Sequence, residues 1–389
     1  MKYLHLFLSA LLLSTQVQAE KVIWSGRKGD AGNSAFINTK TNPDKFKVLW
    51  TKSDWAYTEH FSSSYVTTAT DHLLYFTVEI YNNISTGVYA VEPATGKTVW
   101  RTVLPGNSHI SGALYSNGKV LTTQLEDLYP FKVDMVALDG KTGAVLYSKQ
   151  NGLPWQVVGW PHFIIGNNMY TANAEFVFKM NTESGLIDSK IASGEEGRFY
   201  RPSASSKYIF HPKFEGIDII SAQDDSKVLL EKPIDSFITM EAVVDEKSNT
   251  FYIGYMMRGN PSSEILSAYD LETHQPKWNL VNAGFLYNFV AAKDSLYYSN
   301  NNKVTEVNAV TGKIAWTWEA QPSSKIVDML ATPDILFVSM YDPTEPRVIA
   351  ISRKTHKIVW QINKVAYLSA DYHRLYLNDK QKLTAITLN

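Results

Sequence analysis

Three histidines stand where a metal site could form. His60, His109 and His162 each fall near the start of an apolar, strand-like segment in successive stretches of the chain. Three imidazoles can bind Zn²⁺ or Cu²⁺. These residues, however, are about fifty positions apart, which matches no short metal-binding motif. The pattern therefore favours capped or exposed histidines over a metal site.

A second candidate set combines aromatic and arginine side chains, the residue types that dominate binding hot spots. Its members fall at comparable positions in successive stretches of the chain: Trp160, Arg198, Phe199, Tyr200 and Tyr287. Two interpretations carry equal weight. These side chains either bind a protein or ligand at one end of a central opening in the fold, or they only fill the space there.

Motifs of known chemistry are absent from the sequence. There is no Gly-x-Ser-x-Gly, His-Glu-x-x-His, EF-hand loop or Walker loop. Asp224 and Asp225 are more simply explained as a turn than as a metal site, and His274 and His356 occupy hairpin turns where we expect them to be exposed. No catalytic residue is predicted.

The elements that must position these residues are repeated hairpins. Val88 to Trp100 reads VYAVEPATGKTVW, with an apolar run on either side of a turn. Pro93 fixes its own φ, and Gly96 can take the positive φ that closes a short hairpin. One such hairpin is marginally stable alone, so its recurrence along the chain decides the fold.

The hairpin recurs at a regular period. Equivalent final positions are Trp50, Trp100, Tyr147, Ser189, Leu230, Trp278, Trp316 and Trp360. They are spaced by 38 to 50 residues, about 44 on average, which is the period of a four-stranded propeller blade. The units ending at Ser189 and Leu230 have lost the aromatic residue. We expect the six aromatic positions to dock against a neighbouring blade.

The two ends of the chain predict how the ring closes. The last repeat supplies three strands and then stops, and the early strand from Phe46 to Trp50 has no preceding partner. Pairing it with Leu383 to Leu388 would complete a blade. The sequence thus predicts an all-β, eight-bladed propeller of four-stranded antiparallel blades, whose closure leaves only short protected edges.

The chain divides into three predicted regions. Residues 1–19 have a positive start, a short apolar core and a small-residue cleavage site, as in a secretory signal peptide. Residues 20–44 form a Gly-rich arm, whose Trp24 is expected to anchor it on the outside of the propeller. Residues 45–389 form the single propeller domain. We therefore expect a periplasmic or secreted protein without an integral membrane segment in its mature chain.

The amino-acid composition excludes some classes of partner and site. The chain carries 37 Lys and Arg against 38 Asp and Glu, which argues against nucleic-acid binding because that needs a basic face. It has no Cys, so thiolate metal sites and disulfides are excluded. The 10 Trp, 22 Tyr and 17 Phe are typical of stacked sheets filled by large flat side chains.

The repeat resembles a known one. The pattern Ala-x-(Asp/Glu/Asn)-x-x-Thr-Gly-Lys-x-x-Trp, as in Ala90 to Trp100, is similar to the tryptophan-docking motif of pyrroloquinoline-quinone-type propellers. Trp24 with Gly26, Gly29 and Gly32 is similar to the N-terminal arm of that superfamily. The resemblance covers nearly all of the mature chain and implies the propeller fold. The superfamily includes both quinone-dependent dehydrogenases and exported binding proteins, so the resemblance does not identify the function.

The resemblance also implies what a dehydrogenase would need. The dehydrogenases of the family are longer, commonly carry adjacent cysteines beside the quinone, and bind Ca²⁺ with a set of carboxylates and amides. The candidates for such a set are Glu59, Glu241, Asn288 and Asp328. None lies in a motif that matches the family residue by residue, and solvated polar residues at a propeller mouth explain them more simply.

Two functional hypotheses follow. The preferred one is a non-catalytic exported propeller that acts as a protein- or ligand-binding scaffold in the cell envelope, with another envelope protein or a small ligand as its partner and with no cofactor. The alternative is a quinone-dependent oxidoreductase with a reduced site, which would bind pyrroloquinoline quinone and calcium. Under either hypothesis, ten residues are predicted to bind the ligand or partner at the mouth of the central funnel: Glu59, His60, His109, Trp160, Arg198, Tyr200, Glu241, Tyr287, Asn288 and Asp328.

Overall fold

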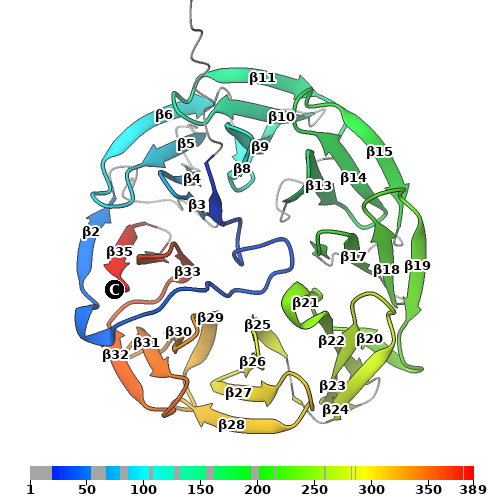
Figure 1. Cartoon of the computed structure of the whole chain (residues 1–389), viewed down its shortest axis with the longest axis vertical. Helices are drawn as coiled ribbons and strands as arrows, with labels where there is room; N and C mark the ends of the chain where they lie inside the picture. The colour runs from blue at the N-terminus through cyan, green and yellow to red at the C-terminus, as the bar shows by residue number, and fades with distance from the viewer. Residues whose placement is uncertain are drawn as a thin grey trace, which may run out of the picture.

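Eight antiparallel sheets stand around a central axis like the blades of a propeller (Figure 1). The computed structural model describes residues 20–53, 67–78, 86–104, 108–126, 132–154, 162–193, 201–213, 216–257, 260–281, 283–284, 286–379 and 381–389. Besides strands, these residues include two short 3₁₀ turns, Pro43–Lys45 and Glu246–Ser248. No helix among them is both long and apolar enough to cross a membrane. The predicted eight-bladed, all-β architecture is confirmed.

The first four blades follow the chain from the closing strand onward. Blade 1 contains β33 (Tyr367–Ala370), β34 (Arg374–Asn378), β35 (Leu383–Thr387) and β2 (Val48–Lys52). Blade 2 contains β3 (Thr67–Thr70), β4 (Leu74–Val78), β5 (Thr86–Val91) and β6 (Thr98–Leu104), and β1 (Val22–Trp24) adds to its inner edge. Blade 3 contains β7 (Ser108–Ile110), β8 (Leu114–Ser116), β9 (Lys119–Glu126), β10 (Lys132–Asp139) and β11 (Val145–Gln150). Blade 4 contains β12 (Phe163–Ile165), β13 (Asn168–Ala172), β14 (Phe176–Asn181) and β15 (Ile187–Ala192).

The remaining four blades complete the ring. Blade 5 contains β16 (Ser203–Ala204), β17 (Tyr208–Pro212), β18 (Gly216–Ser221) and β19 (Lys227–Glu231). Blade 6 contains β20 (Ser236–Ile238), β21 (Val243–Asp245), β22 (Thr250–Met257), β23 (Asn260–Asp270) and β24 (Pro276–Val281). Blade 7 contains β25 (Tyr287–Ala292), β26 (Ser295–Asn300), β27 (Lys303–Asn308) and β28 (Ile314–Glu319). Blade 8 contains β29 (Lys325–Ala331), β30 (Ile335–Tyr341), β31 (Arg347–Ser352) and β32 (Ile358–Ile362).

The two ends of the chain close blade 1, as the sequence predicts. β2 pairs antiparallel with β35, and Trp50 lies opposite Ala385. The Lys47 backbone N–H donates to Thr387 Oγ1 at 3.1 Å, across 340 residues of sequence. β2 thereby becomes the outermost strand of a sheet whose other three strands come from the C-terminus.

Neighbouring blades are joined by an aromatic side chain that lies on the next blade's turn. Trp100 in β6 pairs with Ala90 in β5 and lies over Gly143 of the next blade. Its indole N–H donates to the Gly140 carbonyl at 2.9 Å. Gly143 has φ +72°, and a Cβ there would lie 2.5 Å from the indole. Glycine is therefore required both by the backbone conformation and by the close ring.

The other aromatic positions make related contacts. Trp50 donates to the Pro93 carbonyl at 2.9 Å, Tyr147 to Thr182 at 2.8 Å, and Trp278 to Ala309 at 2.9 Å. Trp316 instead stacks on His356, with ring centroids 4.6 Å apart. Trp360 meets Phe46 edge-on, with centroids 5.6 Å apart.

One equivalence drawn from the sequence is wrong. β19 places Leu230 opposite Ile217, whereas the position opposite Ile219, which matches Ala90 of blade 2, is Val228. The reason is a missing β-bulge: the β5–β6 hairpin shifts register after Ala90, and the β18–β19 hairpin does not. Ser189, by contrast, lies opposite Lys179 after the same kind of shift as Trp100.

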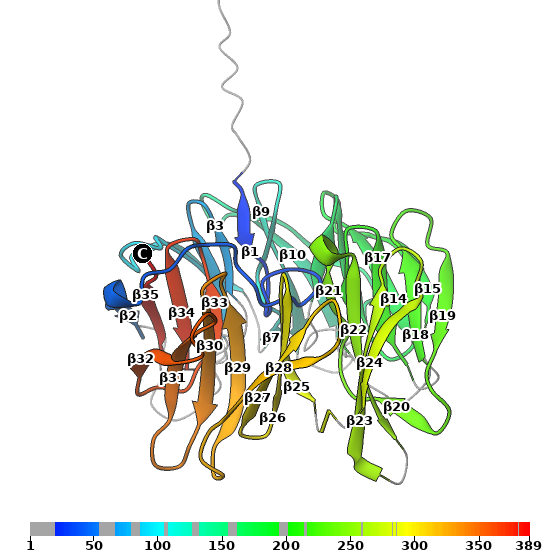
Figure 2. The ribbon, with the colours of Figure 1, turned by 60° about the horizontal axis from the view of Figure 1, so that its bottom comes forward.

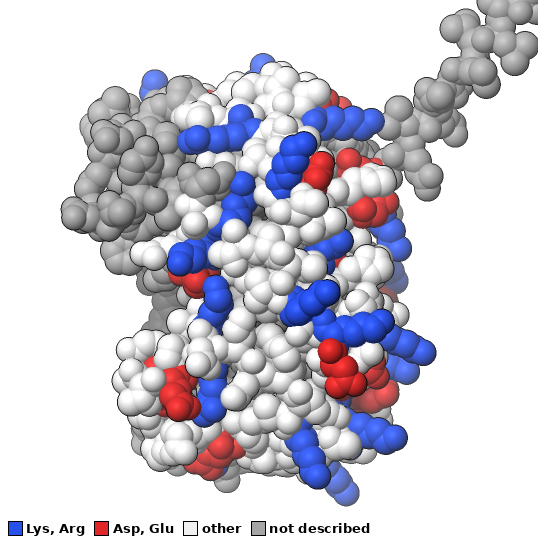
Figure 3. Space-filling model, turned by 90° about the vertical axis from the view of Figure 1, so that its left-hand side faces the viewer, with Lys and Arg blue, Asp and Glu red and all other residues white. Residues whose placement is uncertain are grey.

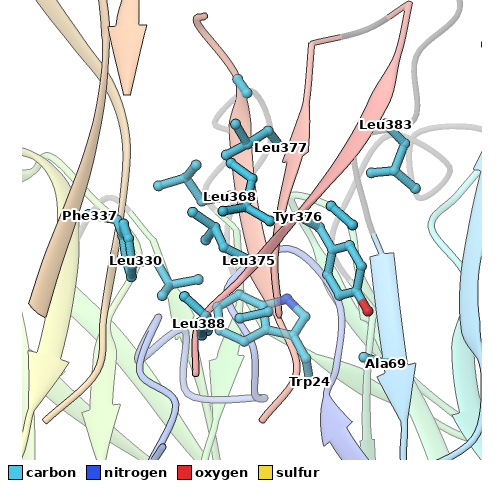
Figure 4. Packing of buried hydrophobic residues seen from close by; sticks show 14 of the residues in the cluster. Trp24, Ala69, Leu330, Phe337, Leu368, Leu375, Tyr376, Leu377, Leu383 and Leu388 are labelled. Carbon is cyan, nitrogen blue, oxygen red and sulfur yellow. The ribbon is translucent and has the colours of Figure 1, made fainter. Parts of the chain in front are cut away.

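The largest core cluster lies where blades 8, 1 and 2 meet, and it contains Trp24. This side chain is 1 % exposed, packed with residues such as Leu375, Tyr376 and Ala69 (Figure 4). The prediction that Trp24 anchors the arm on the outside is therefore wrong. A large indole at the inner edge of blade 2 buries more apolar area than it could on the outer wall.

After Trp24 the arm crosses the centre of the ring, close to one end of the channel (Figures 1 and 2). Its carbonyl groups accept hydrogen bonds from the innermost strands of four successive blades. The donors are the backbone N–H groups of Ala204, Val244, Ala291 and Ala331, and the acceptors are Ala31, Gly32, Ser34 and Ala35, at 2.7 to 2.9 Å. The arm is thus a structural part of the propeller and forms one wall of its central space.

Replacing Trp100 by Ala should destabilise the protein by about 3 to 5 kcal/mol, because the change removes a buried ring and leaves a cavity between blades. Chemical denaturation would measure the loss. Val99, 45 % exposed on the same strand, supplies the control: Val99→Ala should cost less than about 0.5 kcal/mol. Equal losses for the two variants would contradict the docking role.

Gly32→Ala should detach the arm from blade 6. A Cβ at Gly32 would lie 2.7 Å from the Val244 carbonyl oxygen, so one of the two backbones must move. We expect a lower melting temperature and faster proteolysis within residues 25–41. Gly87→Ala is the matched control, because the nearest atom to its added Cβ is 3.4 Å away. Similar behaviour of the two variants would show that the close contact is unimportant.

Candidate functional site

The structure brings several of the predicted mouth residues together. Glu241, Tyr287 and Asn288 line one cavity at the centre of the ring, with a volume of about 430 Å³. Asp328 adjoins it through its ion pair with Lys28, which also lines the cavity. Six further predicted residues lie outside the described residues: Glu59, His60, Trp160, Arg198, Phe199 and Tyr200.

Four blades and the arm contribute to this central cavity. The arm supplies Arg27, Lys28 and Asn33, and blade 5 supplies Arg201 just before β16. Blade 6 supplies residues 239–241 and 243, blade 7 supplies residues 286–289, and blade 8 supplies Ile326. Because the blades contribute only innermost strands and the segments leading into them, the positions of the blades and of the arm together set the shape of the cavity.

A buried ion pair holds the arm against blade 8. The Lys28 ammonium contacts the Asp328 carboxylate, and both side chains are at least 94 % buried. Asp328 also accepts hydrogen bonds from the backbone N–H groups of Met329 at 2.9 Å and Leu368 at 2.8 Å. A buried charge pair of this kind survives only when the remaining lone pairs are also satisfied, and Asp328 meets that condition.

Glu241 is the acidic group on the cavity wall. Burial raises its pKa, while the nearby positive charges of Arg27 and Lys28 act in the opposite direction. Its carboxyl group therefore takes up a proton more readily than an exposed glutamate does. In the neutral form it can donate a hydrogen bond into the cavity.

Two polar atoms at the cavity wall lack partners among the described residues. Asn33 Nδ2 and Thr239 Oγ1 are both buried and make no hydrogen bond there. Buried polar groups are satisfied in nearly all native structures, so orphaned ones call for a water or a ligand. With Arg27 and Arg201, they make the wall rich in hydrogen-bond donors.

Asn288 shows backbone strain at the same wall. Its φ is +29°, an unusual value for a residue other than glycine. Its side-chain amide donates to the Ile326 carbonyl at 3.2 Å, linking blade 7 to blade 8. Such strained residues cluster at binding and active sites.

The described residues of the predicted calcium set do not by themselves complete a calcium site. Asp328, the second described carboxylate of the predicted set besides Glu241, already contacts Lys28 and two backbone N–H groups. Within the described ranges, no three His, Asp or Glu side chains gather where they could hold a metal ion. Ca²⁺ requires six to eight oxygen ligands, and Glu241 with the amide oxygen of Asn288 falls short of that number.

His60 lies outside the described residues, so the structure places two of the three predicted histidines. His109 lies in β7 opposite Leu125, and His162 is a buried residue just before β12. His162 Nε2 is 2.9 Å from Thr123 Oγ1, a contact between blades 4 and 3. The contact gives His162 a structural role at this blade junction.

A second polar cluster contains the residue types of a Ser-His-Asp catalytic triad but not its arrangement. Ser193 Oγ is 2.8 Å from His211 Nδ1 and 2.8 Å from Asp218 Oδ2, and all three residues are at least 97 % buried. Burial lowers the pKa of His211 to about 4. In a catalytic triad the acid holds the histidine, whereas Asp218 bonds the serine and pairs with Lys213 and Lys227. This cluster is structural.

Sequence reasoning missed the basic residues of this site. Arg27 and Lys28 lie in the arm, which a run of glycines marks as flexible, and Arg201 directly precedes a two-residue strand. The available signal was the pair of adjacent cations between Gly26 and Gly29. Its meaning depends on the arm crossing the ring, which the sequence alone does not show.

The outer wall has a different character. On the described part of the face in Figure 3, Lys and Arg are distributed along the wall with Asp, Glu and uncharged residues between them. Arg27, Lys28 and Arg201, by contrast, line one cavity. The cavity is therefore the stronger candidate for recognition of a specific ligand.

Comparison with known proteins supports the fold assignment. A family model described as outer membrane protein assembly factor BamB matches residues 39–194. No curated protein sequence matches the chain. The crystal structure of BamB from Moraxella catarrhalis superposes with a TM-score of 0.62 at 14 % identity, covering 88 % of this chain and 100 % of that one.

A second solved structure is similar to the same extent. A europium-containing methanol dehydrogenase superposes with a TM-score of 0.64 at 11 % identity, covering 92 % of this chain and 89 % of that one. Identities this low show a shared fold and leave function open. Taken with the tryptophan-docking repeat and the eight-bladed ring, these likenesses show that the chain has the β-propeller fold of these proteins.

Proposed function

We propose that the chain is a non-catalytic, exported binding protein of the cell envelope, whose central cavity takes a protein segment or small ligand that carries a carboxylate. The donor-rich cavity wall carries this proposal. Arg27 and Arg201 supply guanidinium groups, which match carboxylates in a bidentate geometry. The unpartnered Asn33 Nδ2 and Thr239 Oγ1 supply further donors.

Two observations support a place in the envelope. Residues 1–19, which lie outside the described residues, have the features of a secretory signal peptide. The family model that matches residues 39–194 is described as an outer membrane protein assembly factor. Such a role would make another envelope protein the source of the carboxylate.

Replacing both Arg27 and Arg201 by Gln should weaken carboxylate binding on the order of a hundredfold, because each hydrogen bond to a charged group is worth about 1.5 to 3 kcal/mol. Titration calorimetry with citrate and with a tri-glutamate peptide would measure the loss. The two probes separate a small ligand from a protein segment.

Arg101→Gln on the outer strand β6 is the matched control and should leave both affinities unchanged. Failure of the unsubstituted protein to bind either probe would overturn the carboxylate proposal. A higher melting temperature with pyrroloquinoline quinone and calcium would instead support the oxidoreductase alternative.

Carboxylate binding should weaken as pH rises through the raised pKa of Glu241. Below that pKa the side chain is neutral and can donate to the ligand, whereas above it two negative charges share the cavity. Glu241→Gln keeps a neutral donor at every pH. Calorimetry of this variant against pH should therefore show tight binding with a flatter profile, and an unchanged profile would contradict the role of Glu241.

A further inference from the structure

The outer edges of the eight blades are not alike. In seven blades the outermost strand shifts register against its neighbour, as β6 does after Ala90. In blade 5, β19 pairs with β18 in one unbroken register over its whole length. A bulge bends a strand and turns its edge away from further pairing. β19 is the one outermost strand of the ring whose pairing contains no such shift.

The edge of β19 is apolar and exposed. The strand lies on the outer rim of the ring, at the end of its sheet (Figure 1). Val228 is 57 % exposed and Leu229 is 36 % exposed, and Ile234, shortly beyond the strand, is 87 % exposed. A regular, exposed, apolar edge is a template on which another strand can pair.

The turn before β19 shows which backbone groups point away from the sheet. The Ser226 carbonyl accepts from the Ser221 N–H at 2.8 Å, so Ser226 faces β18. Backbone direction alternates along a strand, so every second residue after Ser226 also faces β18. The residues between them present their N–H and C=O groups to the outside: Lys227, Leu229 and Glu231. Among the described residues, no strand other than β18 pairs with these positions.

The sequence of β19 is complementary to itself. An antiparallel pairing of two copies about a two-fold axis at Leu229 places every outward residue opposite an outward residue. Leu229 then lies opposite the partner's Leu229, and Lys227 lies opposite the partner's Glu231. Such pairs exchange their backbone hydrogen bonds, and opposite charges at directly opposed positions stabilise an antiparallel pair. The register that satisfies the backbone is therefore also the register that pairs the charges.

Both charged side chains can reach a second copy. Glu231 is exposed and forms no ion pair with another described residue. The Lys227 ammonium donates to the Ala192 carbonyl at 2.6 Å and lies 3.5 Å from Asp218 Oδ2, and its side chain remains 41 % exposed. Because an ammonium has three N–H donors, one remains for a carboxylate of the second copy.

We propose that the protein forms a two-fold symmetric dimer, in which the β19 edges of two copies pair antiparallel and join their blade 5 sheets into one. The same surface is used on both copies, so the assembly closes at two chains and does not extend into a fibre. The interface lies on the rim of the ring and uses none of the residues that line the central cavity. The dimer is therefore independent of ligand binding there.

Sedimentation velocity over a series of protein concentrations tests the dimer. The edge contact is five residues long, at the small end of specific interfaces, so we expect a dissociation constant of about 1 to 100 µM. Leu229→Lys should raise this constant by about tenfold or more, because two like charges then meet at the two-fold axis. Leu146→Lys makes the same change at an exposed position of β11 in blade 3 and should leave association unchanged.

The absence of cysteine from the chain allows a direct test of the register. Opposed residues that exchange backbone hydrogen bonds have Cα atoms about 5.5 Å apart, which is within the range of a disulfide. Leu229→Cys should therefore form a disulfide-linked dimer under mild oxidation. Leu146→Cys, the matched control, should stay unlinked under the same conditions.

A protein that stays monomeric at about 1 mM would overturn the proposal. A dimer that the folded Leu229→Lys variant forms with unchanged affinity would also overturn it, because the interface would then lie elsewhere. If Leu229→Lys does not fold, Glu231→Lys takes its place. This variant changes an exposed side chain and sets two cations opposite each other, so it must weaken the dimer in the same way.

Discussion

The ring depends on one repeated contact, in which an aromatic side chain from the outer strand of one blade lies on the turn of the next. The contact combines apolar burial with a directed hydrogen bond from an indole or phenol to a turn carbonyl, as between Trp100 and Gly140. Because the carbonyl belongs to a tight turn with a positive-φ residue, the donor can bond only when the two blades are correctly placed. Each contact thus sets the angle between two sheets, and the whole set determines the shape of the channel.

The arm adds a second constraint from inside the ring. Its carbonyl groups bond to the innermost strands of blades 5 to 8, and Lys28 is tied to Asp328 in blade 8. The outer contacts fix neighbouring blades in pairs, whereas the arm connects four successive blades, 5 to 8, to the β1 strand in blade 2. The same residues that brace the ring also line the central cavity, so the structural and binding roles of the arm cannot be separated.

The sequence was sufficient to predict features that repeat and insufficient for those that occur once. Eight equivalent hairpins predicted the ring, and an unpaired strand at each end predicted its closure. Leu230 was misplaced because counting residues cannot detect a missing bulge in a hairpin that has lost its marker residues. Trp24 was misplaced because the route of the arm depends on hydrogen bonds to four blades far along the chain. Glu241, Tyr287 and Asn288 were found because they share a place in the repeat, and Arg27 was missed because it lies outside the repeat.

Closure by β2 also has a consequence for the order of folding. Lys47 bonds to Thr387 across 340 residues, so the strand made among the first is completed only when the last one has been made. Until then β2 has no sheet to join, and contacts of such long sequence separation form slowly. After β35 has been made and before β2 pairs with it, the edge of β35 is an exposed template for pairing with another chain. We therefore expect the protein to be most prone to aggregation between its synthesis and the closure of the ring, and less so once the ring is closed.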